Sequence, residues 1–222
     1  NPADADWKLP ENWKEVILSG MADLLRKHRS FRLFLDICVR CGACADKCHF
    51  FLGSGDPKNM PVLRAELLRS VYRRYFTLSG RLFGRFAGAR DLDEDVLKEW
   101  FYYFYQCTEC RRCSVYCPYG IDTCEITMMG RDLLNRVGCN VQWVIEPASN
   151  CFRTGNHLGV PPHAFKETLD FAIDEIKGLT GISVEVPINK KGAEILFVAP
   201  SADYFANPHW FTLLGYLMMF HE

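Results

Sequence analysis

Cysteine spacing constrains this chain more than any other feature of its sequence. Eight of the eleven cysteines fall into two runs with one pattern, Cys38-x2-Cys41-x2-Cys44-x3-Cys48 and Cys107-x2-Cys110-x2-Cys113-x3-Cys117. In two-cluster iron–sulfur proteins, three thiolates spaced by two residues hold one cubane and the fourth cysteine ligates the other cluster. The two runs therefore predict two [4Fe–4S] clusters, whose chemistry is one-electron transfer.

The same rule predicts that each cluster takes ligands from both runs. The first cluster is expected to bind Cys38, Cys41, Cys44 and Cys117. The second cluster is expected to bind Cys107, Cys110, Cys113 and Cys48. Such crossing ties the two halves of a domain together. It assigns no catalytic residue, and the catalytic residues of the protein stay unknown from this sequence.

Two other uses of the cysteines fit the spacing less well. Structural zinc is the main alternative, but zinc sites use separated cysteine pairs rather than runs of four. A disulfide scaffold is disfavoured because 222 residues, 49% of them apolar, can build a core without such cross-links. Since thiolate clusters assemble in reducing compartments, we expect the cytoplasm or the cytoplasmic face of a membrane.

Charge and hydropathy argue against two further classes of protein. The formal net charge of −1 gives no overall reason to bind nucleic acid. A membrane-spanning helix needs about 18 or more consecutive apolar residues. The most apolar segment, 211–220, is too short for that, so we expect no membrane span within this sequence.

Apolar residues recur at spacings of three and four through most of the chain, which is the pattern of amphipathic helices. Asp122 is expected to cap one helix at its start, and Gly138 to end it in a left-handed conformation. The predicted fold class is mainly α, with a helical dicluster domain of the bacterial ferredoxin type. Helices are predicted over 11–28, 61–71, 91–106, 122–138, 163–177 and 209–221.

One segment breaks the helical pattern. The apolar run 193–198, bounded by Pro200, predicts a buried strand. One strand and one helix cannot bury their own faces, so we expect the chain to stop inside the start of an α/β domain. The predicted organisation is an N-terminal helical segment (1–36), the dicluster domain (37–150), a helix and linker (151–192) and an incomplete C-terminal domain (193–222).

Several residues outside the ligand sets also carry hypotheses. Arginines alternate with aromatic residues over 64–90, which predicts either a docking surface or an ordinary solvated helix face. His49 replaces the proline that usually follows the fourth cysteine, and we interpret it as packed or solvated rather than as a residue that tunes a cluster. Packing roles are expected for Cys124, Cys139 and Cys151, with Cys151 the best alternative candidate for a reactive thiol.

The residues around the runs resemble those of heterodisulfide-reductase-like iron–sulfur proteins. The resemblance is carried by Asp36–Cys44, by Cys107–Cys113 and by Cys117–Asp122, and it extends over most of the chain. It implies a cytoplasmic subunit, peripheral on the cytoplasmic face of the membrane, that binds a haem-containing membrane subunit of the DsrM type and other subunits of one complex.

In such proteins electrons would pass between a quinone pool and a disulfide or trisulfide on a small DsrC-like sulfur-carrier protein. The resemblance thus implies an oxidoreductase subunit of dissimilatory sulfur metabolism, with no nucleic acid as partner. The disulfide chemistry would take place at a further iron–sulfur site in a C-terminal catalytic domain, which the segment 193–222 only begins.

Two other functions remain open at this point. One is a pure electron-carrier iron–sulfur subunit of another respiratory dehydrogenase, with no substrate site of its own. The other is a zinc-stabilised interaction protein, which would be colourless when purified. Cysteine-rich motifs after Glu222 would favour the heterodisulfide-reductase-like function over the pure carrier.

Overall fold

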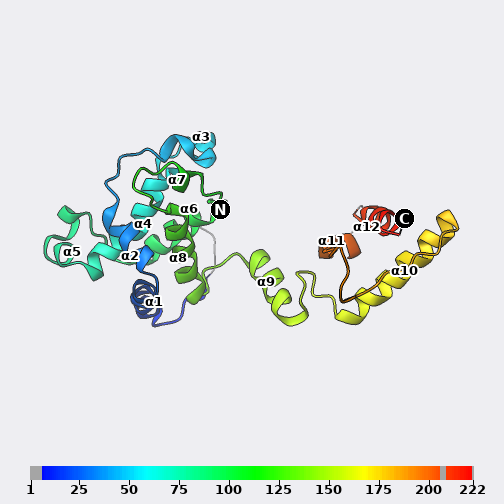
Figure 1. The fold of residues 1–222 in the computed structure, drawn as a ribbon. Helices are drawn as coiled ribbons and strands as arrows, with labels where there is room; N and C mark the ends of the chain where they lie inside the picture. The colour runs from blue at the N-terminus through cyan, green and yellow to red at the C-terminus, as the bar shows by residue number, and fades with distance from the viewer. Residues whose placement is uncertain (1–6, 206–208, 222) are drawn as a thin grey trace. The chain divides into compact units, whose positions relative to one another are not determined.

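The computed structural model describes residues 7–205 and 209–221, and the chain divides into two compact units, 1–140 and 141–222. The first six residues of the predicted segment 1–36 lie outside the described residues, as do 206–208 and Glu222 of the predicted segment 193–222. All regular secondary structure in the described residues is helical (Figure 1). The mainly α fold class is confirmed, whereas the finer domain boundaries stay predictions.

Unit 1 (residues 1–140) is a bundle of helices joined by short turns. Helices α4, α6 and α8 contact one another, and α1 and α2 pack against α8 (Figure 1). The helices are α1 (Trp13–Lys27), α2 (Arg29–Ile37), α3 (His49–Ser54), α4 (Pro61–Phe76), α5 (Leu78–Phe83), α6 (Glu94–Tyr105), α7 (Arg112–Val115) and α8 (Thr123–Arg136). Short 3-10 turns accompany them: η2 (Ala45–Lys47), η3 (Pro57–Asn59) and η4 (Gly84–Ala87).

The core of unit 1 lies where α4, α6 and α8 meet. Leu68, Trp100, Phe104 and Ile126 are fully buried there, and each large apolar side chain removed from water stabilises the fold by about 1.5–3 kcal/mol. The indole Nε1 of Trp100 also donates a hydrogen bond to the Leu67 carbonyl oxygen at 3.1 Å. The helices predicted over 11–28, 61–71, 91–106 and 122–138 are confirmed as α1, α4, α6 and α8.

Helix α8 begins and ends as its sequence predicts. The Asp122 carboxylate accepts hydrogen bonds from the backbone N–H groups of Cys124 (2.9 Å) and Glu125 (3.2 Å), which would otherwise be unpaired. Gly138 has a φ of 78°, the left-handed conformation that favours glycine just after a helix. The capping of this helix matters for function because its first turn faces the cysteines.

Unit 2 (residues 141–222) contains α9 (Gln142–Thr154), α10 (Pro162–Thr180), α11 (Ser201–Phe205) and α12 (Trp210–Met219). Apolar residues of α10 and α12 form its small core, with Ile176 and Leu213 among the most buried. These two helices confirm the predictions over 163–177 and 209–221. Helix α9 was not predicted; it contains Pro147, and none of its residues is buried in the structure.

The strand predicted over 193–198 is wrong. In the structure this segment forms no strand, and Leu196 and Val198 are 87% and 78% exposed. A strand needs a neighbouring strand to pair its backbone hydrogen-bonding groups, and the described residues offer none beside this segment. No helix among the described residues is long and apolar enough to cross a membrane.

Candidate iron–sulfur site

The two cysteine runs line two cavities in unit 1. The first cavity is lined by three cysteines of the first run, Cys38, Cys41 and Cys44, and by Cys117 and Cys113 of the second. The second cavity is lined by three cysteines of the second run and one of the first, Cys107, Cys110, Cys113 and Cys48. Cys113 also lines the first cavity, so the two cavities lie next to each other. This grouping is the one that crossed ligation requires.

Short helices carry the fourth cysteine of the first run away from the other three. Turn η2 separates Cys44 from Cys48, and α3 begins immediately after Cys48. In the second run, α7 contains Cys113 and the chain then turns through Cys117 toward α8. The fourth cysteine of each run thereby lines the cavity of the other run.

The loops between the cysteines curve through matched left-handed residues. Arg40 and Glu109, each two residues after the first cysteine of its run, have φ angles of 58° and 57°. Gly42 and Arg111, each directly after the second cysteine, have φ angles of 78° and 59°. A positive φ is unusual for a residue with a side chain, so surrounding contacts must hold these loops in shape.

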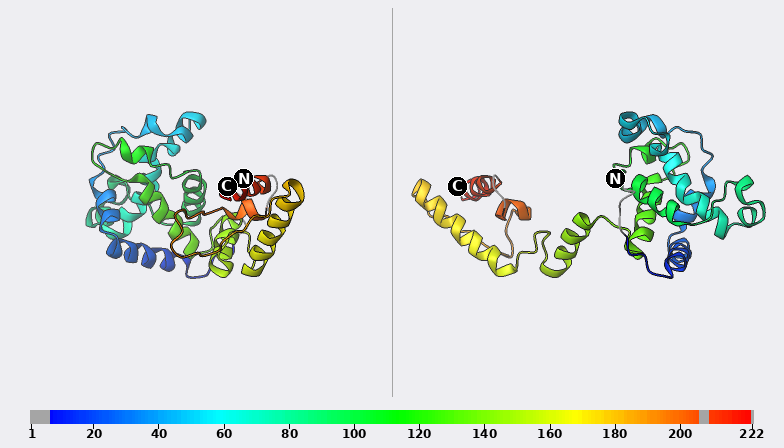
Figure 2. Two further views of the ribbon diagram at one scale, coloured as in Figure 1. Left: turned by 45° about the vertical axis from the view of Figure 1, so that its right-hand side comes forward. Right: turned by 180° about the vertical axis from the view of Figure 1, so that it is seen from behind.

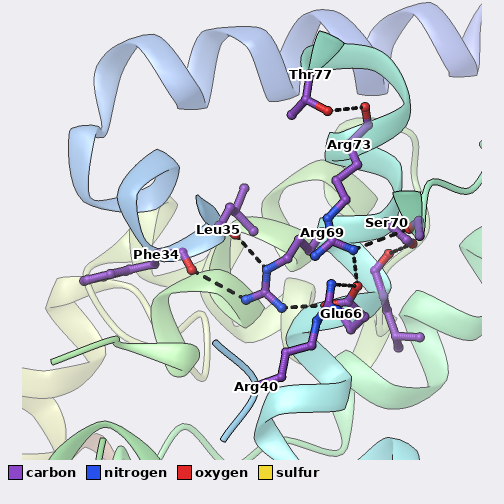
Figure 3. A network of polar contacts seen from close by, with 10 residues as sticks. Phe34, Leu35, Arg40, Glu66, Arg69, Ser70, Arg73 and Thr77 are labelled. Atoms are coloured by element: carbon purple, nitrogen blue, oxygen red, sulfur yellow. Dashed lines mark hydrogen bonds and ion pairs between the residues drawn. The ribbon is translucent and has the colours of Figure 1, made fainter. Parts of the chain in front are cut away.

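A buried arginine on α4 holds the first loop (Figure 3). Arg69 donates from Nε to the Leu35 carbonyl oxygen at 2.8 Å and from Nη1 to Glu66 Oε2 at 2.7 Å. Glu66 in turn accepts from the Nη2 of Arg40 at 2.9 Å, inside the first cysteine run. The last turn of α2 and the loop that follows it are therefore tied to α4 by one network.

The charge of Glu66 is secured by this network. Burial alone would raise the pKa of its carboxyl group, but hydrogen bonds from Arg69 and Arg73 lower the pKa below its ordinary value. Glu66 therefore stays ionised at neutral pH and keeps Arg40, Arg69 and Arg73 together.

Arg131 on α8 holds the loop of the second cysteine run, as Arg69 holds that of the first. Its Nε donates to the Phe104 carbonyl oxygen at 3.1 Å, and its Nη2 donates to the carbonyl oxygens of Phe104 (2.7 Å) and Cys107. Its Nη1 forms an ion pair with Glu109 Oε1 at 2.7 Å. Phe104 stands three residues before the second run, just as Leu35 stands three residues before the first. Each run is thus anchored by an arginine from a long core helix.

The chemistry of these thiols suits an iron cluster. Burial raises the pKa of the Cys44 thiol to about 11 and raises that of Cys113 above its ordinary value, although the hydrogen bond from Thr123 opposes the shift at Cys113. Such thiols become thiolates at neutral pH only when a metal ion binds them. The eight soft sulfur donors around two cavities therefore fit iron–sulfur clusters, and any cluster bound there supplies one-electron transfer.

The cysteine thiols line cavities and do not converge on a position for a single metal ion. A tetrahedral zinc ion would hold its sulfur ligands about 3.8 Å apart, given Zn–S bonds of about 2.3 Å. Across the parts of the chain that the structure describes, no three Cys, His, Asp or Glu side chains converge closely enough for one metal ion.

Three further residues beside the cysteines were not predicted as part of a site. Cys124 and Arg64 are buried and line this cavity beside the predicted ligands. Thr123 donates a hydrogen bond from Oγ1 to Cys113 Sγ at 2.8 Å. Their positions in the first turns of α4 and α8 were predicted, but no spacing rule links those turns to the cysteines.

The other residues that carried hypotheses lie in different environments. His49 lines the second cavity, with its Nε2 atom 3.3 Å from Thr108 Oγ1 and its ring packed beside Phe50. Cys139 lies in the core, as expected, whereas Cys151 is exposed on α9. Within the stretch 64–90, which was predicted to be a docking surface or a solvated helix face, Arg64 and Arg69 are instead buried within unit 1.

Comparison with known proteins agrees with this geometry. Residues 34–121 match the protein family described as 4Fe-4S dicluster domain. The chain is 61% identical, over 217 residues, to the Hdr-like menaquinol oxidoreductase iron-sulfur subunit 2 of Archaeoglobus fulgidus and 58% identical to the corresponding iron-sulfur subunit of Archaeoglobus profundus. Each match covers 98% of this chain and 39% of the relative, so the chain spans about two fifths of these relatives' length.

A more distant relative points in the same direction. It is a subunit of the dihydromethanophenazine:CoB--CoM heterodisulfide reductase of Methanosarcina barkeri, and it is 34% identical over 92 residues, which are 41% of this chain and 22% of that subunit. No solved structure gives a significant match. The prediction of two [4Fe–4S] clusters is confirmed, and the zinc alternative is rejected. Residues 34–121 form a 4Fe-4S dicluster domain, within a chain that is similar to iron–sulfur subunits of Hdr-like menaquinol oxidoreductases.

Proposed function

We propose that this chain is the electron-transferring iron–sulfur part of a heterodisulfide-reductase-like menaquinol oxidoreductase. The observation that carries the proposal is the pair of adjacent cavities, each lined by the four cysteines of one predicted ligand set and sharing Cys113. Two clusters separated by one side chain suit stepwise transfer of single electrons. The names of the Archaeoglobus relatives support menaquinol as the source of those electrons.

The proposed ligands are those that the spacing predicts. Cys38, Cys41, Cys44 and Cys117 would hold the first cluster, and Cys107, Cys110, Cys113 and Cys48 the second. Other residues of unit 1 hold the cysteine loops in place. Arg69 and Arg131 hold the loops, while the core beneath them limits the movement of α4 and α8.

We also propose the finer identity that the residues around the cysteine runs favour, a DsrK-like subunit. It would act on the cytoplasmic face of the membrane, with a DsrM-like haem subunit as the electron-exchange partner and a DsrC-like carrier as the substrate. The relationship to a heterodisulfide reductase subunit supports a disulfide or trisulfide as the electron acceptor. The reaction at sulfur would require a further iron–sulfur site in a C-terminal catalytic domain that includes the segment 193–222.

A candidate contact with the membrane partner is the exposed edge formed by α5 and η4. This edge projects from unit 1 in Figure 1 and, seen from behind, in Figure 2. It exposes Leu82, Phe83 and Phe86 beside Arg81 and Arg85, a mixture of apolar and basic groups that suits a membrane-bound partner.

The proposal is tested on the whole complex purified anaerobically. A reduced menaquinone analogue is added, the sample is frozen after a series of delays, and low-temperature EPR follows the clusters. We expect reduction of both clusters and then re-oxidation when a DsrC trisulfide is supplied. Clusters that stay oxidised with the quinol contradict the proposal. Reduction by the quinol without re-oxidation by any disulfide favours the pure electron carrier instead.

A further inference from the structure

Arg64 is a charged residue in an unusual place. It belongs to the first turn of α4, its side chain is only 2% exposed, and it lines the second cavity. No carboxylate of the described residues lies within ion-pair distance of its guanidinium group. Burying an unpaired cation is costly, so such a group requires a partner of opposite charge.

One end of the guanidinium group is fixed by two side-chain amides, those of the buried Asn59 and the half-buried Gln106. The Nη2 atom of Arg64 donates to Asn59 Oδ1 at 3.0 Å. Asn59 is itself held by Gln106, whose Oε1 accepts from Asn59 Nδ2 at 2.7 Å. Gln106 immediately precedes Cys107, so these contacts connect Arg64 to the start of the second cysteine run.

The other side of the guanidinium group lacks a partner. Among the side-chain nitrogen and oxygen atoms of the described residues, Arg64 Nε is the one that is buried without any hydrogen bond. Buried donors in native proteins are almost always paired. An unpaired donor and an unpaired charge on one side chain, at the wall of a cavity lined by cysteines, point to an anion within that cavity.

The first cavity has no equivalent cation among the described residues. Arg64 is the fourth residue of α4, and the fourth residue of α8 is the buried apolar Ile126. The basic residue that lines the first cavity, Arg40, is partly exposed and paired with Glu66. Of the other basic side chains around the second cavity, Lys47 is paired with Asp46, and Arg111 and Arg112 are exposed, with Arg111 near Asp122.

We propose that Arg64 is the buried counter-charge of the second [4Fe–4S] cluster and donates a hydrogen bond from Nε to a sulfur atom of that site. Adding an electron makes the cluster more negative, so a nearby cation in a low-dielectric wall stabilises the reduced state. Arg64 therefore raises the reduction potential of the second cluster and leaves that of the first almost unchanged. This inference rests on the proposed ligand set of the second cavity.

The test compares Arg64→Met with the unchanged protein, both as the anaerobically purified complex. EPR-monitored redox titration gives the midpoint of each cluster, and Cys110→Ser identifies the signal that belongs to the second cavity. We expect Arg64→Met to make reduction of the second cluster at least about tenfold less favourable, which is about 59 mV for one electron. Arg74→Met removes one charge from the last turn of the same helix, where Arg74 pairs with Asp91 and lines neither cavity, so both midpoints should stay close to their original values.

Two conservative variants keep the test decisive if Arg64→Met fails to fold. Arg64→Lys retains the charge and Arg64→Gln retains only a hydrogen-bond donor, so the midpoint should fall less in the lysine variant. Equal midpoints in these two variants, or unchanged midpoints in Arg64→Met, overturn the proposal. Iron content separates this failure from a failure of the ligand set, because a complex without the second cluster holds about four irons fewer than the unchanged complex.

Discussion

At the scale of single residues, the fourth cysteine of each run decides how the site is built. Cys48 belongs to the first run but lines the second cavity. Cys117 belongs to the second run but lines the first cavity. This exchange makes a specific pair of substitutions informative, because the two variants should damage opposite clusters.

We predict that Cys48→Ala impairs the cluster of Cys107, Cys110 and Cys113, whereas Cys117→Ala impairs that of Cys38, Cys41 and Cys44. Each substitution removes one of four iron ligands and leaves the other cavity intact. EPR of the reduced proteins, together with iron content, measures the loss. If each variant lost the cluster of its own run, the crossed assignment would be wrong.

Thr123 gives a second prediction at this scale. Its hydroxyl donates to Cys113 Sγ, and hydrogen bonds to ligand sulfur raise the potential of a cluster. Thr123→Val should lower the midpoint of the second cluster by up to about 59 mV, a tenfold change for one electron, with both clusters retained. Thr127→Val is the matched control, because Thr127 is also buried but its hydroxyl bonds only to the Thr123 carbonyl oxygen. A similar shift in both variants would show that the effect is not specific to the sulfur contact.

At the scale of helices, the site depends on how closely α6 and α8 approach. Gly130 of α8 lies against the ring of Phe104, and a Cβ atom at this position would come within 2.4 Å of a ring carbon. Phe104 is also the residue whose carbonyl oxygen accepts from Arg131. Phe104 therefore takes part both in the close contact between α6 and α8 and in the anchoring of the second cysteine run by Arg131.

We predict that Gly130→Ala destabilises unit 1 by about 1–3 kcal/mol through overpacking. The thermal midpoint of the anaerobic protein, followed by circular dichroism, should fall by several degrees. Gly53→Ala is the control, because Gly53 is also helical but has no atom within 4 Å of an added Cβ. An equal decrease in both variants would contradict the role assigned to the Gly130–Phe104 contact.

The helices also indicate what their sequences can and cannot reveal. The Asp122 cap and the apolar stripes of α1, α4, α6 and α8 are local signals, and the predictions based on them are confirmed. Arg69 and Arg131 escaped prediction because their partners, the carbonyl groups of Leu35 and Phe104, lie far from them in sequence. The apolar run 193–198 misled because composition suggests a strand but does not provide a neighbouring strand for pairing.

At the scale of the whole molecule, the cysteine runs made the two clusters predictable, but not the residues that would adjust their reduction potentials. The spacing of the cysteine ligands can be read directly from the sequence. Arg64, in contrast, lines the second cavity only because α4 packs beside it in the folded protein. The same folding buried Arg64 and Arg69 and left α5 and η4 as the exposed end of the stretch 64–90. A sequence pattern of arginines and aromatics could not distinguish these two environments.

The exposed end gives a prediction about assembly. Phe86 is 99% exposed on η4, and we expect Phe86→Ser to weaken co-purification with the membrane subunit while both clusters remain. Phe152→Ser is the control, because Phe152 is 94% exposed on α9 of unit 2. Quantitative recovery of the membrane partner measures the effect, and unchanged recovery in the Phe86 variant would remove this edge as a docking surface.

Two [4Fe–4S] clusters in unit 1 are the feature on which every proposed function of this protein depends. The decisive measurement is the iron, zinc and acid-labile sulfide content of anaerobically purified residues 1–222, combined with EPR before and after dithionite. We predict about eight irons with matching sulfide and reducible cubane signals from two clusters. Zinc without sulfide, or about four irons and a single cubane signal, would contradict the two-cluster assignment.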